Sequence, residues 1–194
     1  MGAVVGVLAL QGDFEAHGKV LRALGASVRE IRVRADLDGL DALVLPGGES
    51  TTMTLGIERE GLAAPLRELC ARVPVLGTCA GMILLDREHL GVLDMRCERN
   101  AFGRQVRSFE GDVQLAGFDA PFHGVFIRAP WVAEHGPAVA VLGAVDGHPV
   151  AVAAGRILAV AFHPELAGDA RLHQRLLELS GGRGTATPPA TGST

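Results

Sequence analysis

The feature that most constrains the fold is a cysteine held in a turn of small residues between two apolar runs. Residues 73–76, with Pro74 inside the run, lead into Gly77-Thr78-Cys79-Ala80-Gly81, and a second apolar run follows. This pattern predicts a strand, a tight turn and a helix, with the cysteine at the tip of the turn. Gly77 and Gly81 favour such a turn because glycine adopts backbone angles that other residues avoid.

A cysteine in this position has two interpretations. A helix beginning at Ala80 would direct its free N–H groups and the positive end of its dipole at the Cys79 sulfur, which favours the reactive thiolate. Alternatively, Cys79 is a small buried residue in a closely packed turn. The turn alone does not decide between a nucleophile and a packing residue.

The rest of the chain predicts an α/β fold. Strands are expected over residues 3–10, 27–33, 41–45, 73–77 and 157–162. Helical segments are expected over residues 14–24, 53–70 (interrupted near Gly61) and 169–179, with Asp13 as the N-cap of the first. Strands alternating with helices predict a mostly parallel central sheet between layers of flanking helices, a single-domain three-layer sandwich.

The second half of the chain has shorter strands separated by turns, which predict an added antiparallel region. Strands are expected over residues 92–96, 105–109, 113–115, 124–127, 139–145 and 149–153. The last two meet at Asp146-Gly147, a strong hairpin signal. We expect the domain to span residues 1–180 and the small, polar segment 181–194 to be a disordered tail.

Composition excludes several functional classes. The 194 residues are 48% hydrophobic with a net charge of −4, so no basic surface for nucleic acid or anionic lipid is expected. Cys70, Cys79 and Cys97 show no C-x-x-C spacing, so neither a disulfide framework nor a metal site is predicted. Without a targeting or membrane-spanning segment, a reducing cytoplasm fits best.

Two further segments are expected at the carboxyl ends of parallel strands, where α/β proteins bind ligands. In His163-Pro164-Glu165 the two ionisable side chains can be neighbours, because residues two apart on an extended segment face the same way. The carboxylate could orient the imidazole, and the imidazole could activate a thiol. A strand-terminal turn is the alternative for this segment alone; together with Cys79, the catalytic interpretation is favoured.

The second segment is Gly47-Gly48-Glu49, which lacks the lysine of a phosphate-binding loop. Its backbone N–H groups could stabilise an oxyanion together with the N–H of Ala80.

These segments together resemble a known family. The stretches LPGGEST (45–51), GTCAG (77–81) and FHPE (162–165) resemble, in order and spacing, the class I (triad) glutamine amidotransferases. The stretches LQG (10–12), ERNAFGRQ (98–105) and FIRAP (126–130) are similar to those of the glutaminase subunits of pyridoxal 5′-phosphate synthase. The resemblance extends from Gly6 to about Leu179.

The resemblance implies a role for each matching residue. Cys79 would attack the side-chain amide of L-glutamine to form a thioester, His163 would transfer protons, and Glu165 would orient His163. Oxyanion N–H groups would come from Gly47 and Ala80. The substrate would be held by Gly48, Glu49, Ser50, Arg99, Ile127 and Arg128. An arginine is suited to the substrate carboxylate because it donates paired, charge-assisted hydrogen bonds; a surface ion pair is the alternative for Arg99 and Arg128.

The resemblance also implies a partner. It implies no cofactor, and we expect the ammonia to pass to a separate synthase subunit that builds pyridoxal 5′-phosphate, with the isolated chain weakly active. The alternatives are the glutaminase of another amidotransferase, such as imidazole glycerol phosphate synthase, a cysteine hydrolase or chaperone with the same turn, and a non-catalytic assembly subunit.

Residues outside these motifs are assigned structural roles. His17 is expected to be partly buried or at an interface. Surface or loop positions are expected for His89, His123, His135, His148 and His173. Cys70 and Cys97 are expected to be packing residues, and Trp131 is expected to anchor the loop after Pro130.

Overall fold

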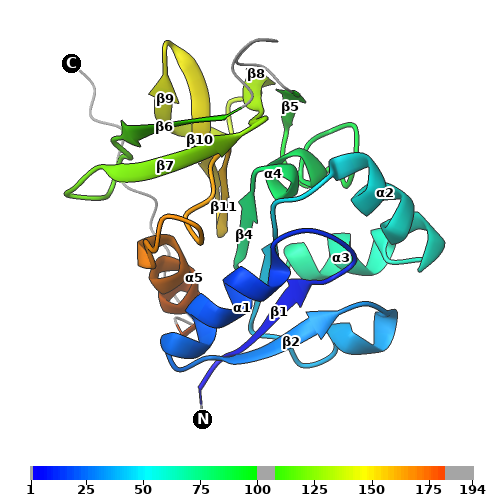
Figure 1. The fold of residues 1–194 in the computed structure, drawn as a ribbon. Coiled ribbons are helices and arrows are strands. Elements are labelled where there is room, and N and C mark those ends of the chain that lie inside the picture. Colours follow the sequence, from blue (N-terminus) through cyan, green and yellow to red (C-terminus); the bar gives the residue numbers. More distant parts are fainter. Residues whose placement is uncertain (1, 100–107, 182–194) are drawn as a thin grey trace.

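The structure of the chain is a computed structural model that describes residues 2–99 and 108–181. Residues 182–194 of the predicted tail, most of the predicted strand 105–109 and most of the ERNAFGRQ stretch lie outside the described residues. Gly181, the first residue of the predicted tail, is instead the last residue of a helix. A seven-stranded sheet crosses the molecule in the order β2-β1-β3-β4-β11-β10-β9 (Figure 1).

Five neighbouring strands of this sheet are parallel, as the sequence predicts. They are β1 (Val4–Leu8), β2 (Ser27–Ile31), β3 (Ala42–Leu45), β4 (Val75–Thr78) and β11 (Ile157–Val160). Every residue of β3, β4 and β11 is buried, which accounts for the continuous apolar sequences of β3 and β11; β4 ends in Gly77 and the buried polar Thr78.

Two antiparallel strands extend the sheet beyond β11. They are β10 (His148–Ala154) and β9 (Ala140–Val145), joined by the predicted hairpin at Asp146-Gly147. Both turn residues have positive φ, 50° and 80°, as a two-residue hairpin turn requires.

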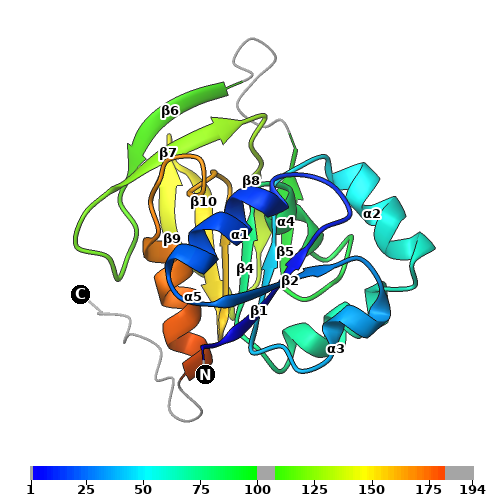
Figure 2. The same ribbon diagram turned by 60° about the horizontal axis from the view of Figure 1, so that its bottom comes forward.

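Helices cover both faces of the sheet. The connection from β1 to β2 and the connection from β3 to β4 run in opposite directions across the sheet. Because both crossovers are right-handed, the helices in these two connections lie on opposite faces. One face carries α1 (Phe14–Ala23) and, beside it, α5 (Arg171–Gly181) (Figure 2). The other carries α2 (Ser50–Arg59), α3 (Ala63–Cys70) and α4 (Ala80–Leu84). A short 3-10 helix, η1 (Arg34–Leu37), was not predicted.

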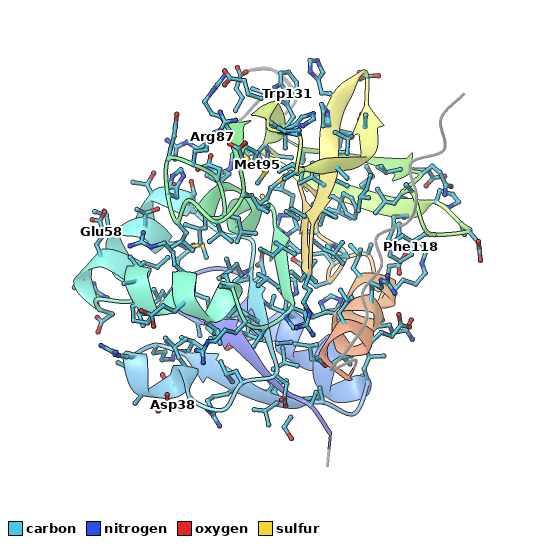
Figure 3. The ribbon with its side chains drawn as sticks, turned by 180° about the vertical axis from the view of Figure 1, so that it is seen from behind. Asp38, Glu58, Arg87, Met95, Phe118 and Trp131 are labelled. Atoms are coloured by element: carbon cyan, nitrogen blue, oxygen red, sulfur yellow. The ribbon has the colours of Figure 1, made fainter. Side chains whose placement is uncertain are left out.

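Two antiparallel ribbons lie beyond the sheet. One pairs β5 (Met95–Glu98) with β8 (Trp131–His135), and the other pairs β6 (Ser108–Val113) with β7 (Phe122–Ile127). Met95 and Trp131 mark the first ribbon in Figure 3. Trp131 also stacks on His148, with ring centroids 3.6 Å apart, which ties this ribbon to β10.

The ribbons correct two predictions. The sequence predicts two strands here, over residues 105–109 and 113–115. In the structure, β6 is one continuous strand from Ser108 to Val113. Trp131 lies in a strand, where a loop was expected. No helix among the described residues is long and apolar enough to cross a membrane.

Candidate active site

Cys79 lies at the tip of the turn between β4 and α4, in a strained backbone conformation with φ 48° and ψ −106°. Its N–H donates to the carbonyl of Val160 at 2.8 Å, which fixes the turn to β11. A Cβ on Gly81 would lie 1.8 Å from the Leu45 carbonyl oxygen, so only glycine lets α4 approach β3 this closely. The turn therefore has the conformation expected of a nucleophile elbow.

His163 and Glu165 follow β11, the strand next to the elbow. The two side chains are hydrogen-bonded, with 2.7 Å between His163 Nδ1 and Glu165 Oε1, and only 4% and 0% of their surfaces are exposed. The His163 backbone N–H donates to the carbonyl of Val125 at 2.9 Å, which also ties the segment to β7.

The protonation of His163 links it to Cys79. Burial lowers the pKa of His163, but hydrogen bonds and charge interactions with Cys79 and Glu165 outweigh burial and raise this pKa to about 10. Since Nδ1 is engaged by Glu165, Nε2 is the nitrogen left for the thiol. The structure thus brings together Cys79, His163 and Glu165, the three residues expected to form a triad.

A cavity of about 390 Å³ opens beside Cys79 and His163, within the size range of small-molecule sites. Its wall contains seven of the eight residues expected to hold the substrate or oxyanion: Gly48, Glu49, Ser50, Ala80, Arg99, Ile127 and Arg128. The Cys79 thiol faces the same region, 3.8 Å from the carbonyl oxygen of Ile127.

The eighth residue, Gly47, lies behind the imidazole of His163. A Cβ on Gly47 would lie 2.3 Å from His163 Cε1, so glycine is required for the ring to sit here. The Gly47 carbonyl accepts a hydrogen bond from the Asp13 N–H at 3.0 Å. Gly48, with φ 156°, forms part of the cavity wall beside Ala80.

The side chain of Glu49 is turned toward its own helix. It caps α2 by accepting from the N–H groups of Thr51 and Thr52 at 3.1 and 2.8 Å and from the Thr52 hydroxyl at 2.8 Å. The hydrogen bonds from Thr52 are the main cause that lowers the pKa of Glu49 to about 2. The carboxylate of Glu49 is therefore used locally, while its backbone forms part of the cavity wall.

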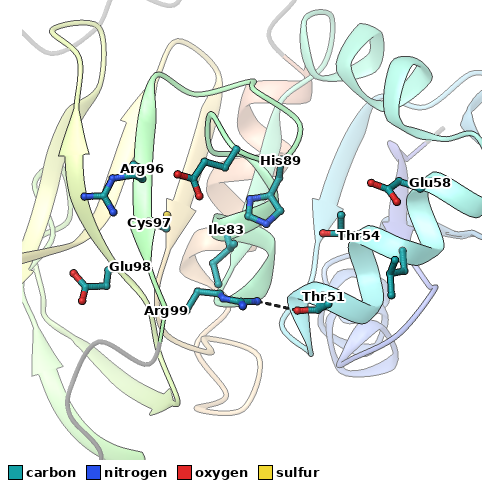
Figure 4. Close-up of a pocket in the computed structure, with 11 residues that line it drawn as sticks. Thr51, Thr54, Glu58, Ile83, His89, Arg96, Cys97, Glu98 and Arg99 are labelled. Atoms are coloured by element: carbon teal, nitrogen blue, oxygen red, sulfur yellow. Dashed lines mark hydrogen bonds between the residues drawn. The ribbon is translucent and has the colours of Figure 1, made fainter.

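Arg99 lies between this cavity and a second one of about 430 Å³, which Figure 4 shows. Its guanidinium donates to the hydroxyls of Ser50 and Thr51 at 3.0 and 2.9 Å. Among the described residues no ion pair involves Arg99, so the surface ion pair considered from the sequence is not observed. Arg128 is exposed at the cavity wall with φ 47°.

Four residues of the cavity wall were not assigned to the site from the sequence: Gln11, Gly12, Asp13 and Ile83. The Gln11 side-chain oxygen accepts the Glu49 N–H at 2.6 Å. Asp13 occupies the predicted N-cap position of α1, although its side chain makes no capping hydrogen bond. Instead, Asp13 Oδ2 lies 3.4 Å from His163 Nδ1. The available signals were the positions of Gln11 and Asp13 soon after β1 and, for Gln11, its place in the LQG stretch.

Two histidines lie where the sequence did not place them. His17 is fully buried, and His173, expected at the surface, is also fully buried. Both lie behind Glu165, with His17 Nε2 3.4 Å from Glu165 Oε2. His173 was misjudged because its sequence neighbours Gln174 and Arg175 are polar and exposed.

Among the described residues, one set of side chains has the composition of a metal site. Ligand-type atoms of Asp13, His163 and Glu165 lie within 4.8 Å of one another. The only ring nitrogen of His163 in this cluster is Nδ1, which already lies 2.7 Å from Glu165. We therefore interpret the cluster as part of the hydrogen-bonded triad.

Comparison with known proteins gives relatives over nearly the whole chain. Residues 7–180 match the model of the SNO glutamine amidotransferase family. A pyridoxal 5′-phosphate synthase subunit PdxT from Mycolicibacterium vanbaalenii is 52% identical over 183 residues, covering 88% of this chain and 94% of the relative. The PdxT subunit from Deinococcus radiodurans is 51% identical over 192 residues, covering 92% and 98%.

Solved structures agree with this similarity. A crystal structure of a glutamine amidotransferase superimposes with a TM-score of 0.85 at 46% identity, covering 92% of this chain and 99% of that chain. The structure of PurLQS from Thermotoga maritima superimposes with a TM-score of 0.69 at 18% identity, covering 92% and 99%, and supports the fold alone.

Proposed function

The chain belongs to the SNO glutamine amidotransferase family, and on that premise we propose that it hydrolyses L-glutamine and supplies ammonia to the synthase subunit of a pyridoxal 5′-phosphate synthase. The observation that carries the glutaminase assignment is geometric: Cys79 and His163 line one cavity, and His163 Nδ1 is hydrogen-bonded to the buried Glu165 Oε1 at 2.7 Å. The interactions with Cys79 and Glu165 also raise the pKa of His163 to about 10. The free, buried cysteines are consistent with a reducing cytoplasm as its location.

The first half of the reaction uses the protonated state of His163. With its pKa raised to about 10, the imidazole of His163 is an imidazolium at neutral pH, and the neighbouring Cys79 sulfur attacks as the thiolate, the nucleophilic form of a cysteine. The thiolate forms a bond to the amide carbon of glutamine, and the carbonyl π electrons move onto oxygen. The Ala80 N–H at the start of α4 and a backbone N–H of the Gly47-Gly48 segment stabilise this oxyanion. When the C–N bond breaks, His163 gives its proton to the leaving ammonia, and a γ-glutamyl thioester remains.

The second half returns the enzyme to its starting state. Neutral His163 takes a proton from water as the water oxygen attacks the thioester carbon. The C–S bond then breaks, which releases glutamate and regenerates the thiolate beside the imidazolium. Glu165 keeps Nδ1 protonated and directed toward itself throughout, so that Nε2 serves both proton transfers.

Substrate recognition follows from the charges at the cavity. The free amino acid carries an α-carboxylate, which Arg99 and Arg128 attract from opposite elements of the wall. Arg99 is held in place by two hydroxyls, which leaves its remaining N–H groups for the ligand.

The proposal is tested by measuring glutamine hydrolysis with and without the synthase subunit. We expect the rate to rise when the synthase subunit is added. Equal rates with and without the synthase subunit would contradict dependence on this partner. If the synthase of another pathway activated the chain instead, the chain would be assigned to that pathway.

A second measurement assigns the nucleophile. Treatment with a glutamine-like electrophile followed by mass spectrometry should label Cys79 and leave Cys70 unmodified, because burial raises the pKa of the Cys70 thiol to about 12. Cys79→Ala should abolish hydrolysis and still bind the synthase. Cys70→Ala is the matched control and should retain activity; hydrolysis by Cys79→Ala would refute the assignment.

A further inference from the structure

Behind the triad, three polar side chains are buried between α1, α5 and the sheet. His17, Thr78 and His173 are each 0% exposed. His17 Nδ1 lies 2.9 Å from His173 Nε2, and His17 Nε2 lies 3.0 Å from Thr78 Oγ1. The reaction described above uses none of these three residues.

This cluster adjoins the unsatisfied oxygen of Glu165. Glu165 Oε1 is bonded to His163, whereas Oε2 is buried and has no hydrogen-bond partner among the described residues. His17 Nε2 is 3.4 Å from Glu165 Oε2, close enough for an N–H at Nε2 to be shared between that oxygen and Thr78. A buried carboxylate oxygen without a donor is costly, so this contact needs an explanation.

Both histidines of the cluster are neutral at physiological pH. Burial, followed by the charges of His173 and His163, lowers the pKa of His17 well below its usual value. Burial also lowers the pKa of His173 to about 4, against the opposing charge of Asp169. The contact between His17 and Glu165 is therefore not an ion pair but a contact between a neutral ring and a carboxylate.

Two tautomer arrangements fit the bond between the two rings. If His17 carried its proton on Nδ1, Nε2 would present a lone pair to Glu165 Oε2. His173 would then carry a buried Nδ1–H for which the described residues offer no acceptor. If both rings carry the proton on Nε2, His173 donates to His17 and His17 donates toward Thr78 and Glu165. The second arrangement leaves fewer buried groups unpaired and is the more stable one.

We propose that His17 is a positioning residue that directs an Nε2–H at Glu165 Oε2, in a tautomer fixed by the Nε2–H of His173. This proposal rests on the proposed function, because it gives Glu165 a second anchor for its role toward His163. A neutral donor is well suited to this position, since it orients the carboxylate without cancelling its charge, which remains available to the His163 imidazolium.

The tautomers can be measured directly in the wild-type chain. Nitrogen-15 NMR of the histidine rings distinguishes a protonated Nε2 from a protonated Nδ1. We expect both His17 and His173 to be neutral and protonated at Nε2 at pH 7. A proton on Nδ1 of His17, or a positively charged His17, would overturn the proposal, and this measurement requires no glutaminase activity.

The effect on the triad is tested with two substitutions of His17. His17→Leu removes the donor, and His17→Gln offers an amide N–H in its place. We expect His17→Leu to lower the pKa of His163, measured by NMR titration, and to reduce kcat/KM about tenfold, the size expected for a lost hydrogen bond to a charged group. In His17→Gln, the pKa of His163 and kcat/KM should both be close to the wild-type values. The control His135→Leu, at an exposed position of β8, should change neither the pKa of His163 nor kcat/KM.

The outcomes separate this inference from the proposed function. A folded His17→Leu variant with an unchanged His163 pKa would refute the positioning role even if the wild-type chain hydrolyses glutamine. Conversely, a wild-type chain that has the expected tautomers but no glutaminase activity would refute the proposed function and leave the His17 contact in place. If His17→Leu does not fold, the tautomer measurement and His17→Gln decide the question.

Discussion

Cys79, the proposed nucleophile, has a strained backbone conformation. Its φ of 48° is a value that L-residues rarely adopt, and such strain costs of order 1–3 kcal/mol. The strain persists because both ends of the turn are fixed, by the bond to Val160 before it and by α4 after it. The same tight turn exposes the sulfur to the cavity.

We therefore predict that Cys79→Gly is more stable than Cys79→Ala. Glycine relieves the strain at positive φ, and after its larger chain entropy in the unfolded state is subtracted, the net gain is about 1 kcal/mol. Both variants lack the nucleophile, so neither hydrolyses glutamine and only stability differs. Urea unfolding of the two variants measures the difference, and equal midpoints would show that the turn is not strained.

The sequence predicts the three proposed catalytic residues but not the two buried histidines next to them. Cys79, His163 and Glu165 were identified because each lies in a short motif at the end of an expected strand. His17 and His173 were not, because helical spacing shows which face a residue shares but not which helices pack together. Their contact depends on α1 and α5 lying side by side, which joins residues far apart in the chain.

At the scale of elements, α4 packs unusually close to β3. The backbone of Gly81 is in contact with the Leu45 carbonyl, where a Cβ would lie 1.8 Å from the oxygen. We predict that Gly81→Ala destabilises the fold by about 3 kcal/mol or more, since neither backbone can move without disturbing the core.

The control for this prediction is Gly111→Ala in β6, where nothing lies within 4 Å of the added methyl group. Thermal unfolding of both variants should show a large loss for Gly81→Ala and a change within about 0.5 kcal/mol for Gly111→Ala. Similar melting temperatures for the two variants would contradict the close approach of α4 to β3.

The start of α2 provides a second prediction for an element. Glu49 caps this helix, so Glu49→Ala should lower the free energy of unfolding by about 1 kcal/mol. Glu49→Gln retains a side-chain oxygen acceptor and should lose less. Chemical denaturation of both variants checks this order, and a larger loss for glutamine would contradict capping as the role of the carboxylate.

Regular elements were predicted better than the ribbons outside the sheet. Four of the parallel strands, β1, β3, β4 and β11, were recognised by their apolar runs, and the edge strand β2 by its alternating sequence. Strand β8 was missed because it follows Pro130 and its sequence, Trp-Val-Ala-Glu-His, has exposed residues at three of five positions. Its partner β5 stabilises it, and a pairing between segments this far apart leaves no local signal.

At the scale of the whole molecule, the buried histidines make the fold sensitive to acid. The pKa of His173 is lowered to about 4 by burial, against about 6.5 when unfolded. Between these values the unfolded chain binds a proton that the folded chain does not. The free energy of unfolding therefore falls as pH decreases through this window, by about 1.4 kcal/mol per pH unit for each such group. The pKa of His17 is lowered too and acts in the same direction.

His17 acts in the same direction over the same acidic range, so the contribution of His173 is isolated by comparing the wild type with a variant that lacks His173. The lowered pKa of Glu49 affects stability only below about pH 4.5, and the raised pKa of His163 makes its stabilisation decline only as pH rises toward 10. We predict that His173→Gln, measured by urea unfolding at intervals from pH 7 to pH 4.5, has a smaller loss of stability on acidification than the wild type. At pH 7 the free energy of unfolding of the variant should be lower than that of the wild type, because the bond to His17 is weakened. The curves of unfolding free energy against pH for the two proteins should converge toward pH 4.5. Parallel curves would mean that His173 is not held neutral by burial, and that α1 and α5 are joined by a contact that acid does not break.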